Sequence, residues 1–120
     1  MKIRVYYEDT DAGGIVYHAN YIKYCERARS EHFFAQGVMP GEGSRSGFVV
    51  RTLKAEYLGM ASLGDLLEVN TTVLQIKNSS VTLLHEITRE EQEIFRMEIV
   101  LVYLEDAKPS RIPDRFKKLF

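Results

Sequence analysis

The spacing of apolar residues changes along the chain, and its longest regular stretch predicts a helix. From about Ala19 to Gln36 the apolar side chains recur every three or four positions, as on one stripe of an amphipathic helix. Gly37 stands where such a helix would end, and Asn20 is a candidate N-cap, with His18 or Ala19 as the other candidate starts. The members of the stripe are Tyr21, Tyr24, Cys25, Ala28, His32 and Ala35.

Strand-like segments follow this helix, and a shorter one, Lys2–Glu8, precedes it. In one of them, apolar Leu67 and Val69 alternate with polar Glu68 and Asn70, the period of two that is typical of a sheet with one solvated face. Short turns between the last three segments favour an antiparallel meander. The four segments after the helix are Phe48–Tyr57, Leu66–Ile76, Val81–Arg89 and Glu93–Glu105.

The order strand, helix, four strands predicts an α+β domain in which the helix packs on the sheet. The stretch rich in glycine and serine between Gln36 and Gly47 is expected to be a surface loop. Residues Val100 to Leu104 are apolar on both faces of their strand, which predicts that further protein covers that end. A length of 120 residues indicates a single domain, residues 1–120.

Composition excludes several classes of protein. With 16 basic and 17 acidic residues and a net charge of -1, the chain lacks the clustered positive charge of a nucleic-acid-binding protein. No apolar stretch reaches the ~18 to 20 residues of a transmembrane segment. The single cysteine, Cys25, excludes an intramolecular disulfide, and together with the lack of a signal peptide it predicts a cytoplasmic location.

The cysteine and the three histidines are not expected to carry the chemistry of a metal or thiolate site. Cys25 lies in the apolar stripe with no histidine at a useful helical offset, so inert packing is expected. His32 falls on the predicted buried face of the helix and His85 in a strand, so both are interpreted as hydrogen-bonded core residues. The histidines give no metal-ligand spacing, so no metal is expected. The absence of a Gly-x-Ser-x-Gly segment argues against a Ser-His-Asp hydrolase.

Candidate chemistry concentrates just before the helix. Glu8, Asp9 and Asp11 lie within four positions, immediately before Gly13, Gly14 and the predicted helix start. Glycines let the backbone approach a ligand closely, and the free N–H groups of a first helical turn favour negative charge. A carboxylate facing those N–H groups would attack or activate water while the amides stabilise an oxyanion. The structural alternative is that these acids only form Asx turns or helix caps.

The same segment resembles the YbgC subgroup of the 4-hydroxybenzoyl-CoA thioesterase family, which has the hotdog fold. The N-terminal part of the resemblance is specific, and the strand matches are weaker. The matching residues are the run Tyr7 to Gly14, then Val16, Tyr17, His18, Asn20, Tyr21, Glu26, Arg27 and Arg29, followed by residues 47–51, 56–57 and 64–69. The resemblance covers most of the chain. The sequence departs from the subgroup at Met60, in a stretch after Tyr57 where members of the subgroup commonly have proline.

The resemblance implies an antiparallel sheet wrapped around one long central helix, with subunits pairing side by side and active sites at the seam. It implies that Asp11 is the catalytic carboxylate, as nucleophile or as general base. The backbone N–H of His18 would polarise the thioester carbonyl, and the His18 side chain would orient substrate or water or, alternatively, cap the helix. Glu8 and Asp9 are expected to be structural partners of nearby arginines, and Glu26 either lies near the site or pairs with Arg29.

Substrate contacts are also implied by the resemblance. A slot for the pantetheine arm would run along Gly47 to Val50 of a neighbouring subunit. Lys77 stands in a turn where related enzymes have cationic contacts, and Arg51 or Arg89 is the alternative. The residues expected to bind substrate are Tyr7, Gly14, Val16, Tyr17, Tyr21, Glu26, Phe48, Val49, Val50 and Lys77.

The resulting hypothesis is a thioesterase that hydrolyses an acyl-CoA, or an acyl carrier protein thioester, to a free acid and a thiol. No cofactor is expected beyond the coenzyme A of the substrate, and a homotetramer built as a dimer of dimers is expected. The alternative is a hotdog module that binds an acyl carrier or another protein with little or no catalysis. A hotdog hydratase ranks last, because it would have a histidine much closer to the aspartate with Asn-Pro between them. Here the residues between Asp11 and His18 include Gly-Gly-Ile-Val-Tyr instead.

Overall fold

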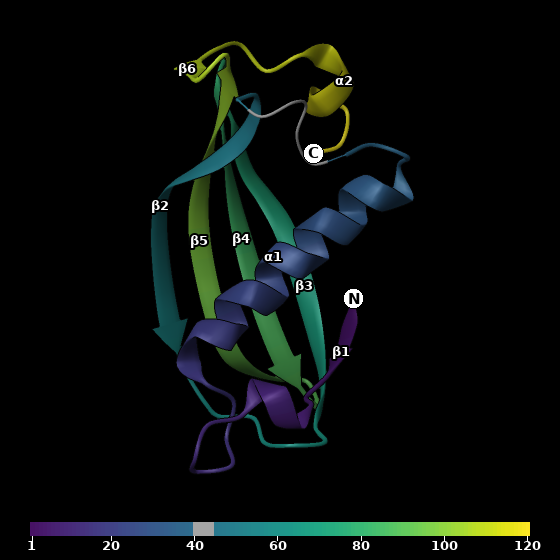
Figure 1. The fold of residues 1–120 in the computed structure, drawn as a ribbon, viewed down its shortest axis with the longest axis vertical. Coiled ribbons are helices and arrows are strands. Elements are labelled where there is room, and N and C mark those ends of the chain that lie inside the picture. Colours follow the sequence, from purple (N-terminus) through teal and green to yellow (C-terminus); the bar gives the residue numbers. More distant parts are fainter. Residues whose placement is uncertain (40–44) are drawn as a thin grey trace.

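One antiparallel sheet curves around one long helix in this protein (Figure 1). The computed structural model describes residues 1–39 and 45–120. The elements are β1 (Lys2–Arg4), the 3-10 helix η1 (Tyr7–Asp9), α1 (His18–Ala35), β2 (Gly47–Tyr57), β3 (Leu66–Ile76), β4 (Ser80–Arg89), β5 (Gln92–Glu105), β6 (Lys108–Pro109) and α2 (Asp114–Lys117). The α+β prediction is therefore confirmed, and the loop predicted over 36–47 lies partly outside the described residues.

The strands lie in the order β1-β3-β4-β5-β2, with β6 paired to β5. The consecutive strands β3, β4 and β5 are antiparallel neighbours, which confirms the predicted meander. β2 pairs with β5, with Tyr57 opposite Phe95 at one end and Phe48 opposite Tyr103 at the other. β2 is thus an edge strand of the sheet. Side chains along it, such as Val50 and Leu53, are more than two-fifths exposed.

The core lies between α1 and the concave face of the sheet. In β4 the residues alternate between buried and half-buried, as the period of a strand requires. His85, one of the buried residues, is 0% exposed, so its predicted place in the core is confirmed. The prediction is wrong for His32 and Ala35, which are exposed, while Phe33 is buried. The last turns of α1 extend past the sheet (Figure 1), which explains why the stripe is not buried along its full length.

The two ends of α1 are formed differently. The helix begins at His18, one of the candidate starts, and Tyr17 is the N-cap although its side chain makes no capping hydrogen bond. Asn20 lies inside the first turn, so the alternative in which Asn20 is the N-cap is wrong. The helix ends as predicted before Gly37, which has a φ of 73°. The N–H of Gly37 donates to the carbonyl of Phe34 at 2.9 Å, and that of Val38 donates to Phe33 at 3.0 Å. These two bonds form a Schellman motif, which needs the left-handed conformation that glycine adopts without strain.

The strand predicted over Lys2–Glu8 is shorter in the structure. Only β1 pairs with β3, and the chain then turns into η1. The turn forms because the Asp9 carboxylate accepts a hydrogen bond from the N–H of Tyr6 at 2.9 Å. A side chain that captures a nearby backbone N–H in this way offers the backbone an alternative to a strand ladder.

The C-terminal segment forms β6 and α2, which the sequence patterns did not predict. Phe116 of α2 contacts the rings of Tyr103 and Phe48, with centroids 5.7 Å and 5.8 Å apart. Leu101, Val102 and Tyr103 are buried within this single chain. The apolar run at the end of β5 therefore does not require a second protein to bury it, contrary to the prediction. No helix in the described ranges is long and apolar enough to cross a bilayer.

Candidate active site

Asp11 lies at the tip of a small hairpin that leads into α1. Thr10 and Val16 pair across this hairpin, and the N–H of Asp11 donates to the carbonyl of Ile15 at 2.9 Å. The Asp11 side chain is exposed, and its Oδ1 accepts a hydrogen bond from the N–H of Gly13 at 2.8 Å. A Cβ at position 13 would lie 3.3 Å from that same oxygen, so glycine leaves the carboxylate the room it occupies.

Asp9 ties the hairpin to the start of α1. Its Oδ1 accepts a hydrogen bond from the Asn20 amide at 3.0 Å, and its backbone carbonyl accepts one from the N–H of Tyr17 at 2.9 Å. The side chain is only 6% exposed. The expectation of an arginine partner for Asp9 is wrong, because the carboxylate is held by amide donors. Asp9 therefore has a structural role beside the site, as expected, although through different partners.

The N-terminus of α1 presents free backbone donors beside this hairpin. The N–H of Asn20 donates to the Tyr17 carbonyl at 2.8 Å, but the N–H groups of His18 and Ala19 have no acceptor among the described residues. The first turn holds no acidic residue. Unpaired N–H groups and the helix dipole together favour an anion or a polarised carbonyl oxygen at this position.

Aromatic rings surround the helix start. The ring centroids of Tyr17 and His18 lie 4.5 Å apart, and the Tyr57 ring lies 6.3 Å from that of His18. The Tyr57 hydroxyl donates to the His18 carbonyl at 2.9 Å, which joins β2 to the first turn of α1. Tyr17, His18 and Tyr57 are exposed, so these rings form an accessible aromatic wall.

Tyr21 and Tyr24 lie behind that wall in the core. Burial raises the pKa of the Tyr21 hydroxyl, which accepts a hydrogen bond from the N–H of Ala61 at 3.0 Å. Burial, and then the neighbouring Asp9 carboxylate, raise the pKa of Tyr24, whose oxygen has no partner within hydrogen-bonding distance among the described residues. Both phenols stay protonated at neutral pH and act as packing groups.

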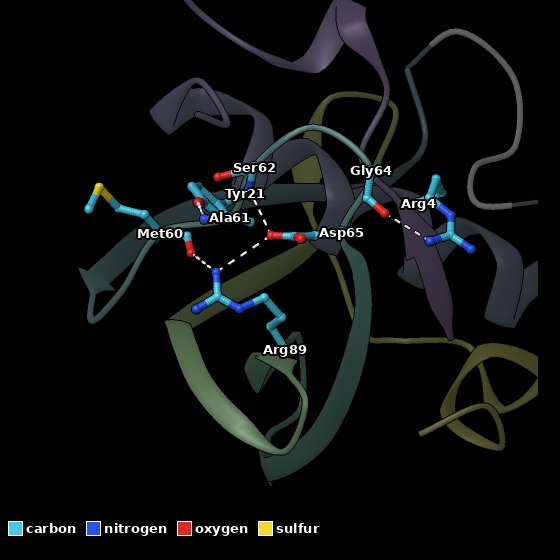
Figure 2. A network of polar contacts seen from close by, with 8 residues as sticks. All are labelled: Arg4, Tyr21, Met60, Ala61, Ser62, Gly64, Asp65 and Arg89. Carbon is cyan, nitrogen blue, oxygen red and sulfur yellow. Dashed lines mark hydrogen bonds and ion pairs between the residues drawn. The ribbon is translucent and has the colours of Figure 1, made fainter. Parts of the chain in front are cut away.

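The loop between β2 and β3 contacts the hairpin, and Figure 2 shows the hydrogen bonds and the ion pair that hold this loop. The carbonyl of Ala61 accepts the N–H of Val16 at 2.9 Å, and Ile15 pairs with Ser62. Asp65 closes the loop by accepting the N–H of Ser62 at 2.8 Å. The loop and the hairpin thus form one hydrogen-bonded unit.

Two arginines clamp this loop (Figure 2). Arg89 lies 3.5 Å from the Asp65 carboxylate and also donates to the carbonyl of Met60. Arg4 donates to the carbonyl of Gly64 at 2.8 Å. The suggestion that Arg89 substitutes for Lys77 in binding a nucleotide is therefore not favoured, because its guanidinium already holds the loop.

The predicted site residues fall into separate groups within one chain. Those near the hairpin are Tyr7, Asp11, Gly14, Val16, Tyr17, His18 and Tyr21. Of these, Val16 and Tyr21 are each 3% exposed, so their contacts with substrate stay predictions. Gly14, with a φ of 79°, adopts the left-handed conformation that closes the hairpin. Tyr7 is 82% exposed.

A second group lies further along α1. Glu26 lines a pocket of about 330 Å³ together with Phe48, Val49 and Val50 of β2. Lys77 stands at the turn between β3 and β4, at the opposite end of the sheet from the start of α1 (Figure 1). One chain alone therefore does not bring Lys77 or the start of β2 next to Asp11.

The structure also identifies supporting residues whose roles the sequence did not reveal. Arg29 makes no ion pair with Glu26, and its Nη1 lies 3.1 Å from Nε2 of the buried His85 instead. Asn20 and Tyr57 hold the helix start through the hydrogen bonds described above. Both fall in segments that match the family, but only the fold shows which groups they contact.

The fold and the hairpin site define a hotdog domain with a carboxylate beside an uncapped helix N-terminus. Residues 13–95 match the profile of the Thioesterase superfamily (4HBT). The chain therefore belongs to the thioesterase superfamily.

Known relatives agree with this assignment over nearly the whole chain. "Acyl-CoA thioesterase YbgC" of Helicobacter pylori is 43% identical over an alignment that covers 99% of this chain and 97% of the relative. "Acyl-CoA thioester hydrolase YbgC" of Escherichia coli is 41% identical and covers 92% of this chain and 87% of its own. The crystal structure of a probable thioesterase from Bartonella henselae superposes with a TM-score of 0.85 at 30% identity, covering 94% and 97%. The predicted resemblance and hotdog fold are confirmed.

Proposed function

We propose that this chain hydrolyses acyl-CoA thioesters to a free acid and coenzyme A, with Asp11 as the catalytic carboxylate. The similarity to relatives named as acyl-CoA thioesterases supports this reaction. The observation that carries the assignment is an exposed carboxylate, Asp11, on the hairpin that leads into a helix start. At that start the N–H groups of His18 and Ala19 have no acceptor among the described residues. A thioester carbonyl bound at those N–H groups would be polarised as negative charge develops on its oxygen.

Asp11 then acts in one of two ways. As a nucleophile, its free oxygen attacks the carbonyl carbon, the thiol leaves, and water hydrolyses the resulting anhydride. As a general base, it takes a proton from water that attacks the same carbon, and the thiol leaves after protonation. Single-turnover hydrolysis in ¹⁸O-labelled water tests for the nucleophilic route. Label in the Asp11 side chain arises only when water attacks the Asp11 carbonyl of an anhydride, which the general-base route never forms.

The substrate slot is proposed to be shared between subunits. A two-fold axis relates identical edge strands in antiparallel fashion, so joining two β2 strands would make one continuous sheet. A pairing centred near Thr52, the middle of β2, would place the partner's Val49 and Val50 near the end of β2 where Tyr57 contacts His18. The exposed side chains along β2 support this arrangement. Association of two such dimers gives the expected tetramer.

Light scattering tests this assembly. A dimer or tetramer in solution is the expected result, and a fully active monomer would contradict the shared slot. The substitution Leu53→Lys, at an exposed position of β2, should weaken association and lower activity together.

The proposal needs no metal and no cofactor, since coenzyme A enters as part of the substrate. An acyl carrier protein thioester is the alternative form of the substrate, because both carry the acyl group on the same pantetheine thiol. A reducing, cytoplasmic location is part of the proposal, as expected for a chain whose single cysteine forms no intramolecular disulfide.

A hydrolysis screen tests the function. Purified protein should release thiol from at least one member of a panel of acyl-CoAs that runs from short aliphatic to long-chain and aromatic acyl groups. Weak turnover on every thioester, beside tight binding of acyl carrier protein, would instead support the alternative of a binding module.

A further inference from the structure

A second cavity lies on the side of α1 away from β2. Its volume is about 820 Å³, and it lies between the later turns of α1 and the strand β3, with the C-terminal residues Leu119 and Phe120 on its rim. Figure 1 shows the C-terminus beside this end of the helix. Neither Asp11 nor His18 lines it. The cavity is therefore separate from the hairpin that carries Asp11, although Arg29 and Phe33 also line the pocket beside Glu26. Its volume lies in the range of small-molecule pockets.

The walls of this cavity are mainly apolar. Phe33 from α1, Val69 and Val73 from β3, and Leu83 from β4 contribute to them. Leu119 and Phe120 add further apolar surface at the C-terminal side. A ligand with a hydrocarbon or aromatic body would bury its surface there, which is favourable by about 25 cal/mol per Å² of apolar area.

The charged groups that line the cavity are Arg29, Glu31 and the N-terminus of Met1, which pairs with Glu68. Of these, Arg29 is held by a neutral partner. Arg29 lines the cavity, and its Nη1 lies 3.1 Å from Nε2 of His85. Because a guanidinium can only donate, Nε2 must be the acceptor, and the proton of the ring lies on Nδ1. That nitrogen lies 2.8 Å from Oγ1 of Thr71 and donates to it. The Thr71 hydroxyl, which also lines the cavity, keeps its own proton for another acceptor.

The charge of Arg29 is not neutralised within the described residues. The side chain is half-buried, yet no carboxylate lies within ion-pair distance of it in residues 1–39 and 45–120. The Glu26 carboxylate, one turn earlier on α1, interacts electrostatically with the Arg29 guanidinium only from a longer distance. Removing a charged group from water without a counter-charge costs free energy, so the site favours an incoming anion. The four remaining N–H donors of the guanidinium are able to bind one.

We propose that this cavity binds an apolar monocarboxylate, with the carboxylate on Arg29 and the Thr71 hydroxyl and the body among the apolar walls. A planar guanidinium pairs well with a carboxylate, and such charge-assisted hydrogen bonds are about twice as strong as neutral ones. A free carboxylic acid is also the class of product that the proposed hydrolysis releases. Binding in the cavity does not depend on that hydrolysis, so the two proposals fail separately.

Calorimetric titration with octanoate, and with octanol as the uncharged match, tests the site. Wild-type protein and Asp11→Asn should bind octanoate with the same affinity, whereas octanol should bind at least about tenfold more weakly. Arg29→Gln keeps an N–H donor for His85 but removes the charge, and should also lose about tenfold or more. Val73→Trp, at a position 37% exposed, should block the cavity and abolish octanoate binding while hydrolysis stays within about twofold of wild type.

Three results would overturn the proposal. The first is no saturable octanoate binding to the wild-type protein. The second is an unchanged affinity in Arg29→Gln, which would show that the charge is not used. The third is loss of octanoate binding in Asp11→Asn with normal binding in Val73→Trp, which would place octanoate in the catalytic site instead.

Discussion

The Asp9 carboxylate accepts a hydrogen bond from the Asn20 side-chain amide at 3.0 Å, and this contact helps to join the hairpin that carries Asp11 to the first turn of α1. The same carboxylate holds the N–H of Tyr6, and its backbone carbonyl holds the N–H of Tyr17. The mutual position of Asp11 and the free N–H groups of the helix therefore depends on a neighbouring carboxylate that is itself buried.

A double-mutant cycle between these two residues should show strong coupling. Asn20→Ala should lower the free energy of unfolding by about 1 to 3 kcal/mol, because it leaves a buried carboxylate short of a donor. Asp9→Ala should cost more, because the N–H of Tyr6 also loses its partner. The double variant should cost no more than Asp9→Ala alone. Urea unfolding measures all three, with Lys23→Ala at an exposed position of the same helix as the control.

If the losses in the free energy of unfolding of the two single variants add up in the double variant, the hydrogen bond between Asp9 and Asn20 contributes little. The catalytic rate is the second readout: kcat should fall severalfold in Asn20→Ala and stay unchanged in Lys23→Ala.

Gly13→Ala should slow catalysis without unfolding the protein. The added Cβ would lie 3.3 Å from Oδ1 of Asp11, so the carboxylate must move by a few tenths of an ångström. Small displacements of a catalytic group are costly to rate because orientation supplies much of the barrier reduction. Steady-state kinetics should show a severalfold lower kcat with little change in KM, at an unchanged melting temperature. A wild-type kcat would show that the position of this oxygen does not matter.

His85 should make stability depend on pH below neutrality. Burial, and then the Arg29 charge, lower its pKa to about 3. The unfolded chain takes up a proton near pH 6.5 and the folded chain does not, so stability falls with pH below that value, by about 1.4 kcal/mol per unit. His85→Gln, which keeps an acceptor for Arg29, should remove this slope between about pH 6.5 and pH 5. Equal slopes in the two proteins, measured by urea unfolding, would refute the assignment.

Cys25 should be inert in the folded protein. It is 0% exposed, and burial raises the pKa of its thiol to about 12, so almost no thiolate exists at neutral pH. Ellman's reagent should therefore label no thiol in native protein and one thiol in urea. Cys25→Ala should retain activity, since the side chain only packs against the sheet. Fast labelling of the native protein would contradict this account.

The sequence predicts the fold well where one interaction dominates. Helical spacing places α1 to within one residue at each end, and Leu66–Ile76 was predicted with the boundaries that β3 has. The alternation of apolar and polar residues and the short turns suffice to predict the meander. A strand with one buried face has few alternative registers, because a slip of one residue would turn its apolar side chains to the solvent. Of the three candidate starts, His18 is the first residue of α1, and Asn20 is not the N-cap because its side-chain amide binds Asp9.

The parts that were not predicted depend on contacts distant in sequence. α2 has only four residues, and Phe116 is buried because Tyr103 and Phe48 form its pocket. The partner of Arg29 was expected one turn away on the helix, but it is His85, 56 residues later. Similarly, the family motif identified Asp11, yet the free N–H groups and the Asp9 tether are visible only in the fold. Local patterns cannot show which side chains meet across the core.

The most direct test of the proposed site compares kcat of Asp11→Asn with that of Glu8→Gln on the best acyl-CoA substrate. Both variants remove one exposed carboxylate at nearly constant shape, and the two positions lie three residues apart. Asp11→Asn should lower kcat by about 100-fold or more, as expected for loss of a nucleophile or general base, while Glu8→Gln should stay within about twofold. Wild-type turnover by Asp11→Asn, at unchanged stability, would contradict the central claim that this carboxylate performs the hydrolysis.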